Sequence, residues 1–335
     1  MEKKNLRIGF IGAGSIGSLF GGYLAKIKSE YYSIEVIFFC LKAHADKVNT
    51  TGLKLYRNQQ MSIVKNIKAY EDEKVFDAKI EEDPSFKFDF IFLTTKAYDS
   101  EAAVRQYKKL IDISKWLVIL QNGIGNEDIV IPYCKKSKII RVVTSAGAFL
   151  DKPGHLIHTG EGITKIGFPF LYGLDLDQQM MQQAKLDISL LKDILNLAGL
   201  ETIIVEDIIG ECWEKVLVNI GINALGALTR LPNGKLLEFE DLKDIMGEAV
   251  KEAIKVAEMK KIKLSERDYI AITYDVAEKT AQNKNSMLQD ILNRKPTEIE
   301  FMNGRILRYA KDLGVKVPFN ESLTFLIRGL EHSII

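Results

Sequence analysis

The sequence lacks a charge imbalance, a cysteine framework and a long hydrophobic run. Its 46 basic and 45 acidic side chains leave a formal charge of +1, so overall charge gives no reason to expect nucleic acid or an anionic membrane as a partner. The three cysteines have no CxxC spacing, which argues against disulfides or a zinc site and favours a reducing cytoplasm. No stretch approaches the roughly 20 uninterrupted apolar residues of a membrane span. We therefore expect a soluble, cytoplasmic chain.

Two short stretches imitate features that we do not expect here. MEKK followed by IGFIGAGSIGSLFGG resembles a signal peptide, but six glycines between Gly9 and Gly22 interrupt its apolar part, so we expect an unprocessed chain. His155 and His158 form an HxxH pattern directly after Pro-Gly. Because no further Cys/His cluster follows, we expect an ordinary turn and strand there, and we predict no metal site.

The first half of the chain alternates short β-rich runs with helical or loop segments. Mostly apolar runs of this kind are typical of strands buried on both faces, and the alternation predicts a parallel, doubly wound sheet of the Rossmann type. Short antiparallel strands are expected between residues 53 and 69, and a hairpin over residues 156–167 is expected to close the domain. The main candidate strands are residues 6–11, 33–39, 88–94, 116–120 and 138–145.

The second half has helical periodicity and little strand signal, which predicts an all-α domain. Pro296 and Gly314 suit the start and the stop of one of its helices. We place the domain boundary near residue 173, giving domains of residues 1–173 and 174–335. The candidate helices are residues 178–198, 209–228, 245–260, 266–281, 297–313 and 321–332.

A glycine-rich stretch directly after the first candidate strand predicts a dinucleotide site. Gly12, Gly14 and Gly17 have the G-x-G-x-x-G spacing and are followed by an apolar helix. The three glycines allow a tight turn, close approach of the backbone to a pyrophosphate, and close packing of helix on strand, with the phosphates at the helix N-terminus. The expected cofactor-binding residues of this loop are Gly12, Ala13, Gly14, Ser15, Ile16 and Gly17.

The end of the second candidate strand favours NADPH over NADH. An acidic residue there would bind the ribose hydroxyls of NADH, whereas a basic residue suits the additional phosphate of NADPH. The candidate position is Lys42, with His44 and Lys47 nearby and no carboxylate before Asp46. The alternative is that Lys42 is an ordinary solvated lysine.

Two further strand ends carry polar residues into the crevice where a doubly wound sheet binds its ligand. Lys96 follows the strand in FIFLTTKAYD, and Asn122 follows the strand in WLVILQNGIGNE. Both are candidates for contacts with the cofactor or substrate. For Asn122, a turn role is an equally good interpretation, because Asn-Gly is a common turn dipeptide.

A polar stripe interrupts an otherwise apolar helix in CWEKVLVNIGINALGAL. Lys215, Asn219 and Asn223 are each four residues apart and therefore lie on one helical face. Hydride transfer to a ketone leaves negative charge on oxygen, which needs a preorganised donor and then a proton, and an ammonium group supplies both. The alternative is structural, with a lysine that extends its head from the core and asparagines that bind backbone groups.

The chain resembles the ketopantoate reductase (2-dehydropantoate 2-reductase) family. The resemblance rests on the glycine-rich stretch, TTKAYD, LQNGIGNED, CWEKVLVNIGINALGAL and NSMLQDILNRKPTEIEFMNG, which follow one another in order over nearly the whole chain. It implies a Rossmann-type domain followed by a helical domain of the 6-phosphogluconate dehydrogenase type. It also implies NADPH-dependent reduction of 2-dehydropantoate to (R)-pantoate, a step toward pantothenate and coenzyme A.

The resemblance also assigns roles to residues. It makes Lys215 the general acid. It places five residues against the substrate: Asn122, Asn219, Asn223, Ser286 and Glu298. It sets Lys96, Asn122 and Glu298 beside the cofactor. Helix capping by Ser286 and a favourable first-turn position of Glu298 are the structural alternatives. The alternative functions are a related 2-keto acid reductase or 3-hydroxy acid dehydrogenase, and a non-catalytic NADP(H) sensor. A homodimer through the helical domain is possible.

Overall fold

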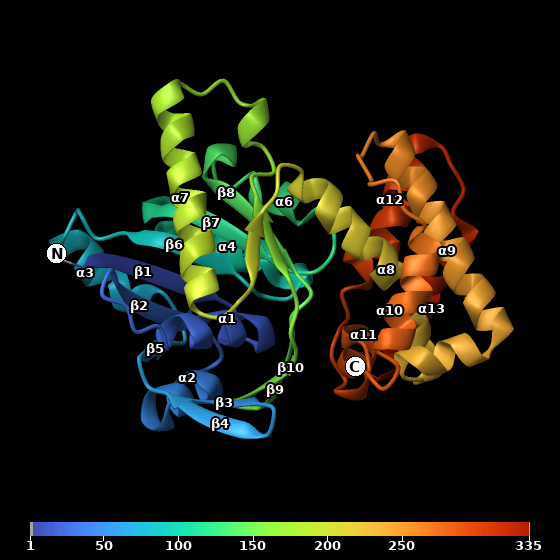
Figure 1. Ribbon diagram of the computed structural model, residues 1–335, viewed down its shortest axis with the longest axis horizontal. Coiled ribbons are helices and arrows are strands. Elements are labelled where there is room, and N and C mark those ends of the chain that lie inside the picture. The colour runs from blue at the N-terminus through green and yellow to red at the C-terminus, as the bar shows by residue number, and fades with distance from the viewer. Residues whose placement is uncertain (1–2, 335) are drawn as a thin grey trace. The chain divides into compact units, whose positions relative to one another are not determined.

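The computed structural model describes residues 3–334, and the chain forms two compact units. The first unit comprises the chain up to Gln121 together with Glu127–Ile208. The second comprises Asn122–Asn126 together with the chain from Ile209 onward, whose helices are drawn in yellow to red in Figure 1. A five-residue segment from the first half of the sequence therefore belongs to the second unit.

The first unit is built on an eight-stranded sheet in the order β12-β11-β8-β7-β6-β1-β2-β5. Strands β5, β2, β1, β6, β7 and β8 pair in parallel, whereas β11 is antiparallel to β8. This confirms the doubly wound sheet and its five predicted strands. The strands are β1 (Lys4–Ile11), β2 (Tyr32–Phe39), β5 (Ile67–Tyr70), β6 (Phe88–Leu93), β7 (Ser114–Leu120), β8 (Ile139–Thr144), β11 (Thr164–Gly167) and β12 (Thr202–Ile204).

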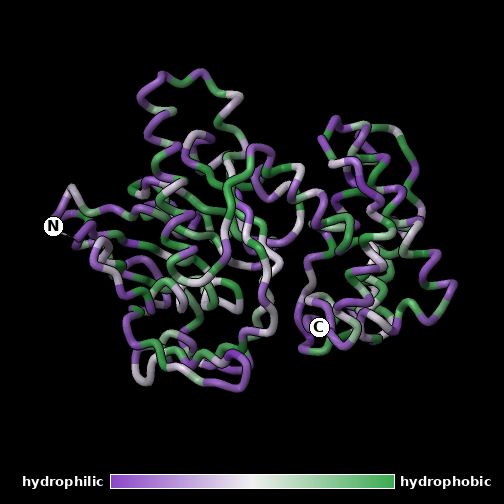
Figure 2. Tube along the Cα trace, in the orientation of Figure 1, coloured by the Kyte–Doolittle hydropathy of each residue, from purple (hydrophilic) through white to green (hydrophobic). Residues whose placement is uncertain are grey.

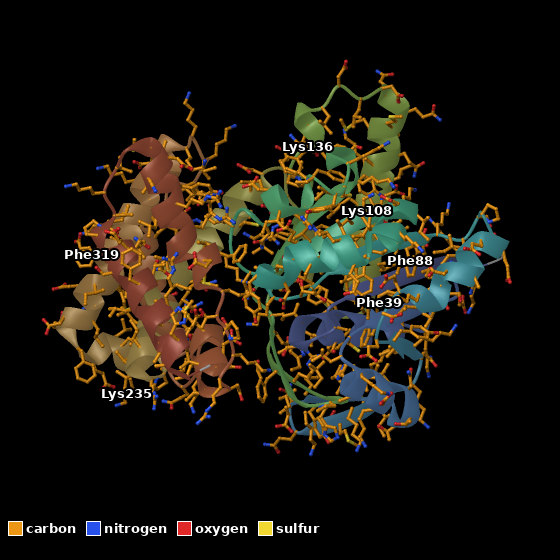
Figure 3. All side chains as sticks on the ribbon, turned by 180° about the vertical axis from the view of Figure 1, so that it is seen from behind. Phe39, Phe88, Lys108, Lys136, Lys235 and Phe319 are labelled. Carbon is orange, nitrogen blue, oxygen red and sulfur yellow. The ribbon has the colours of Figure 1, made fainter. Side chains whose placement is uncertain are left out.

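Both faces of the large sheet are covered because its strands are apolar on both sides. Phe90 and Phe92 lie in a core cluster shared with α1 and α7, whereas Ile91 and Leu93 lie in a second cluster shared with α4 and α5. The hydrophobic runs can be followed in green in Figure 2, and Figure 3 labels Phe39 and Phe88 among the sticks. The helices of this unit are α1 (Ser15–Ala25), α2 (Lys42–Thr51), α3 (Asp77–Glu82), α4 (Ser100–Gln106), α5 (Lys108–Ile113), α6 (Asn126–Val130) and α7 (Gln178–Leu197).

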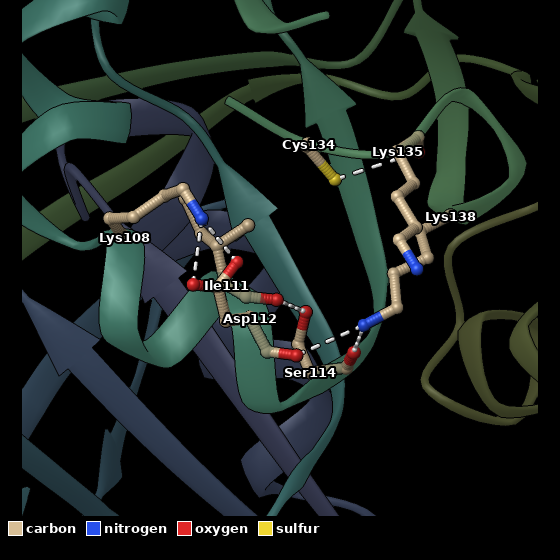
Figure 4. A network of polar contacts seen from close by, with 7 residues as sticks. All are labelled: Lys108, Ile111, Asp112, Ser114, Cys134, Lys135 and Lys138. Carbon is tan, nitrogen blue, oxygen red and sulfur yellow. Dashed lines mark hydrogen bonds and ion pairs between the residues drawn. The ribbon is translucent and has the colours of Figure 1, made fainter. Parts of the chain in front are cut away.

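Polar contacts fix the start of β7 and β8, at the opposite end of these strands from their carboxyl ends (Figure 4). The ammonium group of Lys138 donates to the backbone carbonyls of Asp112 and Ser114 at 3.0 and 2.8 Å. The Ser114 hydroxyl donates to the carbonyl of Ile111 at 2.8 Å, which closes the end of α5. These contacts set where β7 begins, and its seven residues then carry the chain to the end of the sheet where the parallel strands have their carboxyl ends.

A smaller four-stranded sheet in the order β4-β3-β10-β9 completes the first unit. The antiparallel pair β3 (Leu53–Arg57) and β4 (Gln60–Val64) confirms the short strands expected there. The hairpin expected over residues 156–167 is wrong. The first of its strands, β10 (His155–Gly160), pairs with β9 (Gly147–Lys152) across the Pro-Gly turn, whereas β11 pairs with β8 in the large sheet. Sequence alternation alone does not reveal that adjacent strands enter different sheets.

The first unit extends beyond the boundary expected near residue 173. Helix α7 places Ile188, Leu191 and Ile194 in the core cluster of the large sheet, and β12 pairs in parallel with β11. The division of the chain falls at Ile208 instead. The periodicity of α7 predicted the helix itself, but an apolar face does not identify the surface that it covers.

All elements of the second unit within the described residues 209–334 are helices or 3₁₀ turns, as expected. Gly314 ends α12 with a left-handed φ of +70°, which confirms the predicted stop. The helix expected from residue 297 begins only at Asn303, because Ile299–Phe301 forms a separate 3₁₀ turn. Helix α11 was not predicted. The helices are α8 (Ile208–Thr229), α9 (Glu240–Met259), α10 (Tyr269–Lys279), α11 (Ser286–Leu292), α12 (Asn303–Leu313) and α13 (Pro318–Ile334).

None of the helices within residues 3–334 has the length and apolar character needed to cross a membrane.

Candidate active site

The glycine-rich loop joins β1 to α1 at the point where the strand order reverses between β1 and β6. Gly12 has a φ of +77°, and a side chain there would come within 2.3 Å of Thr95. A side chain at Gly17 would come within 2.4 Å of the Thr94 hydroxyl, so helix and strand pack too closely for a larger residue. At Gly14 the nearest atom is 3.8 Å away. The middle glycine therefore leaves open space, as the approach of a pyrophosphate requires.

The first turn of α1 offers donors for an anion. Gly14 caps the helix without a side-chain hydrogen bond, and the first backbone N–H groups of any helix have no acceptor within it. The Ser15 hydroxyl accepts a hydrogen bond from the N–H of Leu150 at 3.0 Å, so its own hydrogen can point elsewhere. Ala13 is buried, and Ile16 is half-buried against the core. The loop therefore fits a dinucleotide phosphate.

The residues after β2 differ in their exposure. Lys42 is exposed and forms an ion pair with Asp46 at 2.9 Å, and the hydrogen bond that Lys42 donates to Asp46 is the main cause that raises the pKa of Lys42. His44 is buried, and burial lowers its pKa to about 4. His44 is therefore neutral at pH 7 and does not add to the positive charge expected near Lys42.

The end of β6 lies at the same edge of the sheet as the glycine loop. The Thr94 hydroxyl donates to the carbonyl of Gly12 at 2.9 Å. The Gln121 side chain donates to the carbonyl of Thr95 at 2.9 Å, which connects the ends of β7 and β6. Lys96 follows directly and is half-buried. The first unit thus carries Lys96 beside the residues that form the dinucleotide loop.

Three predicted residues come together in the second unit. Lys215 Nζ donates to Asn122 Oδ1 at 2.9 Å, and Asn122 Nδ2 donates to Glu298 Oε2 at 3.4 Å. Glu298 is only 4% exposed. The amide of Asn122 therefore stands between an ammonium group and a carboxylate, and it contacts each with the atom of matching polarity.

The segment Asn122–Asn126 is held in place by the chain just before α12. The N–H of Ile124 donates to the carbonyl of Phe301 at 3.0 Å. Gly123 has a φ of +86°, and a side chain there would come within 2.5 Å of Phe301. Asn126 Nδ2 donates to the carbonyl of Asn122 at 2.9 Å. The Asn-Gly dipeptide therefore forms a turn, as one interpretation expected, and the same turn presents Asn122 to Lys215.

The remaining predicted residues lie on α8 and at the start of α11. Asn219 is half-buried, and buried Asn223 donates to the sulfur of Met302 at 3.5 Å. Ser286 is the first residue of α11, but the cap is Asn285, whose side chain accepts from the N–H of Leu288 at 2.9 Å.

The start of α11 is also tied to α8. Asn285 Nδ2 donates to the carbonyl of Ile222 at 3.5 Å, and a side chain at Gly226 would come within 2.2 Å of that nitrogen. Ser286 is therefore brought to the helix that carries the polar stripe.

The expectation that a helix dipole favours the Glu298 anion is wrong. Glu298 precedes a 3₁₀ turn of three residues, and α12 begins five positions later at Asn303. The contact shown for this carboxylate is instead the Asn122 amide. No group of three or more His, Cys, Asp or Glu side chains within residues 3–334 is arranged to hold a metal ion.

A glycine loop at the switch point of a doubly wound sheet, together with a lysine, an amide and a carboxylate in a helical unit, defines a dinucleotide-dependent oxidoreductase. The chain belongs to the ketopantoate reductase family. The family model described as ketopantoate reductase PanE/ApbA matches residues 8–169, and the C-terminal model of the same family matches residues 207–331.

Individual relatives agree with the family models. A 2-dehydropantoate 2-reductase from Pyrococcus abyssi is 34% identical over 97% of this chain and 98% of its own. A structure of D-mandelate dehydrogenase with NADH and anilino(oxo)acetate is 28% identical, with a TM-score of 0.84 over 98% of this chain and 99% of its own. A PanE/ApbA family ketopantoate reductase from Ralstonia eutropha is 26% identical, with a TM-score of 0.80 over 98% and 99% of the two chains.

Proposed function

We propose that the protein reduces the ketone of 2-dehydropantoate to the alcohol of (R)-pantoate with NADPH, as a step toward pantothenate and coenzyme A. The observation that carries the proposal is the Lys215–Asn122–Glu298 cluster in a chain that belongs to the ketopantoate reductase family. NADPH, when bound, supplies the hydride. The chain itself must supply a proton, an orientation for the substrate and a site for the dinucleotide.

Lys215 is the proposed proton donor. Its ammonium group already donates to a neutral oxygen, that of Asn122, and a ketone oxygen of the substrate would present the same kind of acceptor. As negative charge develops on that oxygen, the hydrogen bond from the ammonium group strengthens, and the proton then passes to the alkoxide. Asn122 holds Lys215 in position without neutralising its charge, because an amide carries no net charge.

Glu298 and the two other asparagines are the proposed substrate contacts. An ionised carboxylate only accepts hydrogen bonds, so Glu298 suits a hydroxyl group of the substrate. Asn219 and Asn223 lie on the same face of α8 as Lys215, one and two turns further along. Ser286, at the start of α11, would donate to the substrate carboxylate. Lys96 and the glycine loop would hold the dinucleotide.

A substrate panel tests the proposed function. We expect NADPH oxidation to be fastest with 2-dehydropantoate and slower, in kcat/KM, with other branched or aromatic 2-keto acids. The second candidate is a dehydrogenase of a different 2-hydroxy acid, which the fold similarity to D-mandelate dehydrogenase favours. Phenylglyoxylate, the 2-keto acid that corresponds to mandelate, is therefore part of the panel. A kcat/KM for phenylglyoxylate equal to or above that for 2-dehydropantoate would overturn the first proposal in favour of the second.

Replacing Lys42 with aspartate tests the coenzyme preference. Because Lys42 is exposed after β2 and is the proposed contact for the additional phosphate, we expect Lys42→Asp to lower the NADPH-to-NADH ratio of kcat/KM about tenfold. Asp46→Asn should raise that ratio, since it releases Lys42 from its ion pair. Steady-state kinetics with both coenzymes measure the two effects. Unchanged ratios in both variants would show that another residue binds the phosphate.

The proposal also covers location and assembly. A reducing cytoplasm suits the free state of Cys40, Cys134 and Cys212. A homodimer through the helical unit would cover the exposed side chains of Phe325 and Leu326 on α13.

A further inference from the structure

A buried histidine connects three parts of the first unit that are distant in sequence. His44 on α2 is 4% exposed. Its Nε2 lies 3.1 Å from the Ser18 hydroxyl on α1, and its Nδ1 lies 3.0 Å from the N–H of Gly154 in the turn between β9 and β10. The imidazole therefore joins the helix of the glycine loop to the smaller sheet.

The hydrogen bonds determine which nitrogen carries the proton. The Gly154 N–H is a donor, so Nδ1 of His44 must be the acceptor and lacks a hydrogen. In the neutral ring the hydrogen is then on Nε2, which donates to the Ser18 hydroxyl. That hydroxyl donates in turn to the carbonyl of Ala13 at 3.1 Å. The chain of donors runs in one direction, from the Gly154 turn to a carbonyl inside the glycine loop.

The end of this chain lies where the dinucleotide site needs a fixed backbone. Ala13 separates Gly12, which has a left-handed φ of +77°, from Gly14, where the backbone is open. The N–H of Ala13 donates to the carbonyl of Phe39 at 3.1 Å, so both backbone polar groups of Ala13 are held. Fixing them orients the peptide groups on either side, including the N–H groups that precede α1.

We propose that His44 is a positioning residue for the dinucleotide loop, acting through Ser18 on Ala13. This inference rests on the proposed dinucleotide-dependent function. Binding to an already ordered loop costs less entropy than binding to a mobile one. Loss of the His44 contact should therefore weaken nucleotide binding and leave the proton transfer by Lys215 in the second unit unchanged.

Protonation of His44 would push the ring away from Gly154 and Ser18, an effect that the neutral glutamine of His44→Gln does not have. A cationic ring carries hydrogens on both nitrogens, so Nδ1 would face the Gly154 N–H with a second donor. Burial is the cause that lowers the pKa of His44 to about 4. The binding-competent neutral form therefore persists above that pH, and it is lost as the pH falls through about 4. The titratable groups that flank the Gly154 turn are Lys47 of α2, Lys54 of β3, Asp151 and Lys152 of β9, and His155 of β10, whose pKa is itself lowered, mainly by burial.

Two neutral substitutions separate the two contacts of the ring. Glutamine reaches the position of Nε2 and keeps a donor for Ser18, whereas asparagine reaches only the position of Nδ1 and keeps an acceptor for Gly154. We expect His44→Asn to raise the Kd of NADP⁺ about fivefold to tenfold at pH 7, and His44→Gln to stay within about threefold of the unaltered protein. Ser18→Ala removes the hydroxyl that connects His44 to Ala13. It should raise the Kd of NADP⁺ as much as His44→Asn does.

Titration calorimetry with NADP⁺ between pH 4 and 7 measures these constants, and kinetics at saturating NADPH give kcat. We expect kcat to change less than twofold, so that the effect falls on KM. The ratio of the Kd of the unaltered protein to that of His44→Gln should rise toward pH 4, because only the histidine takes up a proton, while titration of the nucleotide phosphate cancels in the ratio.

The outcomes distinguish this inference from the proposed function. If the unaltered protein does not bind NADP⁺, the proposed function itself fails. If it binds and both His44→Asn and Ser18→Ala keep a Kd within twofold, the positioning role is overturned. A Kd ratio that stays flat from pH 7 to 4 would overturn it as well, since a purely structural histidine could weaken binding but would not produce that pH profile.

Discussion

Replacing Lys215 with methionine is expected to lower kcat by about 100-fold or more, the usual range for loss of a general acid. Methionine keeps an unbranched side chain that can pack along α8, but it has neither a charge nor a proton to donate. The developing alkoxide would then depend on water and on neutral amides such as Asn219. Because the dinucleotide loop belongs to the first unit, the Kd of NADPH should stay within about twofold.

Two further variants show which property of Lys215 matters. Lys215→Arg keeps a cation that does not release its proton, so it should recover part of the electrostatic effect and little of the proton transfer. Lys311→Met removes an exposed lysine of the same unit and should leave kcat unchanged. A kcat for Lys215→Met within about twofold of the unaltered protein would exclude general-acid catalysis by this residue. If nucleotide binding is then the only measurable activity, the protein is an NADP(H) sensor.

The sequence predicted those parts of the site that depend on local spacing. Gly12 has the positive φ of a tight turn, Gly14 has open space beside it, and Gly17 packs against Thr94, as the motif predicts. All three features depend on a local segment of six residues. Polar residues at steps of four on α8 had to share a face. The contact between Lys215 and Asn122 was not predicted. The family resemblance assigned both residues to the site, but 93 positions separate them and no local pattern reports such a contact.

The predictions that were wrong or missing concern features that are determined by tertiary contacts rather than by local sequence. The apolar face of α7 could have covered either unit, and β10 and β11 enter different sheets although only three residues separate them. His44 was named only as a basic residue near Lys42, and nothing in the local sequence indicated that its ring is buried. Asn285, which caps α11, was missed because Ser286 is an equally good capping residue by type.

Arg141 is the clearest signal in the sequence that was not used. A single arginine interrupts the apolar run of β8, and the structure buries it to 1% exposure. Its Nε lies 2.5 Å from Glu127, which is also buried. Its terminal nitrogens donate to the carbonyls of Ile119 and Gln121, both at 3.0 Å. The guanidinium therefore fixes the end of β7 directly before Asn122.

We expect Arg141→Met to lower the free energy of unfolding of the first unit by about 3–5 kcal/mol, because the Glu127 carboxylate is left buried without its partner. The two tryptophans make this measurable, since Trp116 lies in the first unit and Trp213 in the second. In a Trp213→Phe background, urea unfolding followed by fluorescence reports on the first unit alone. A loss below about 1 kcal/mol would show that Glu127 finds another partner or water.

The double variant Arg141→Met/Glu127→Leu separates stability from catalysis. Removing both charges together should restore most of the lost free energy, because a well-packed apolar pair often replaces a buried ion pair at little cost. The carbonyl of Gln121 still lacks its donor in this variant, and Gln121 is covalently followed by Asn122, the residue that holds Lys215. We therefore expect both Arg141→Met and the double variant to have a kcat about tenfold below that of the unaltered protein, although stability recovers in the double variant, since small displacements of a positioning residue are costly in rate. Recovery of both would show that Arg141 supports the fold and has no effect on the site.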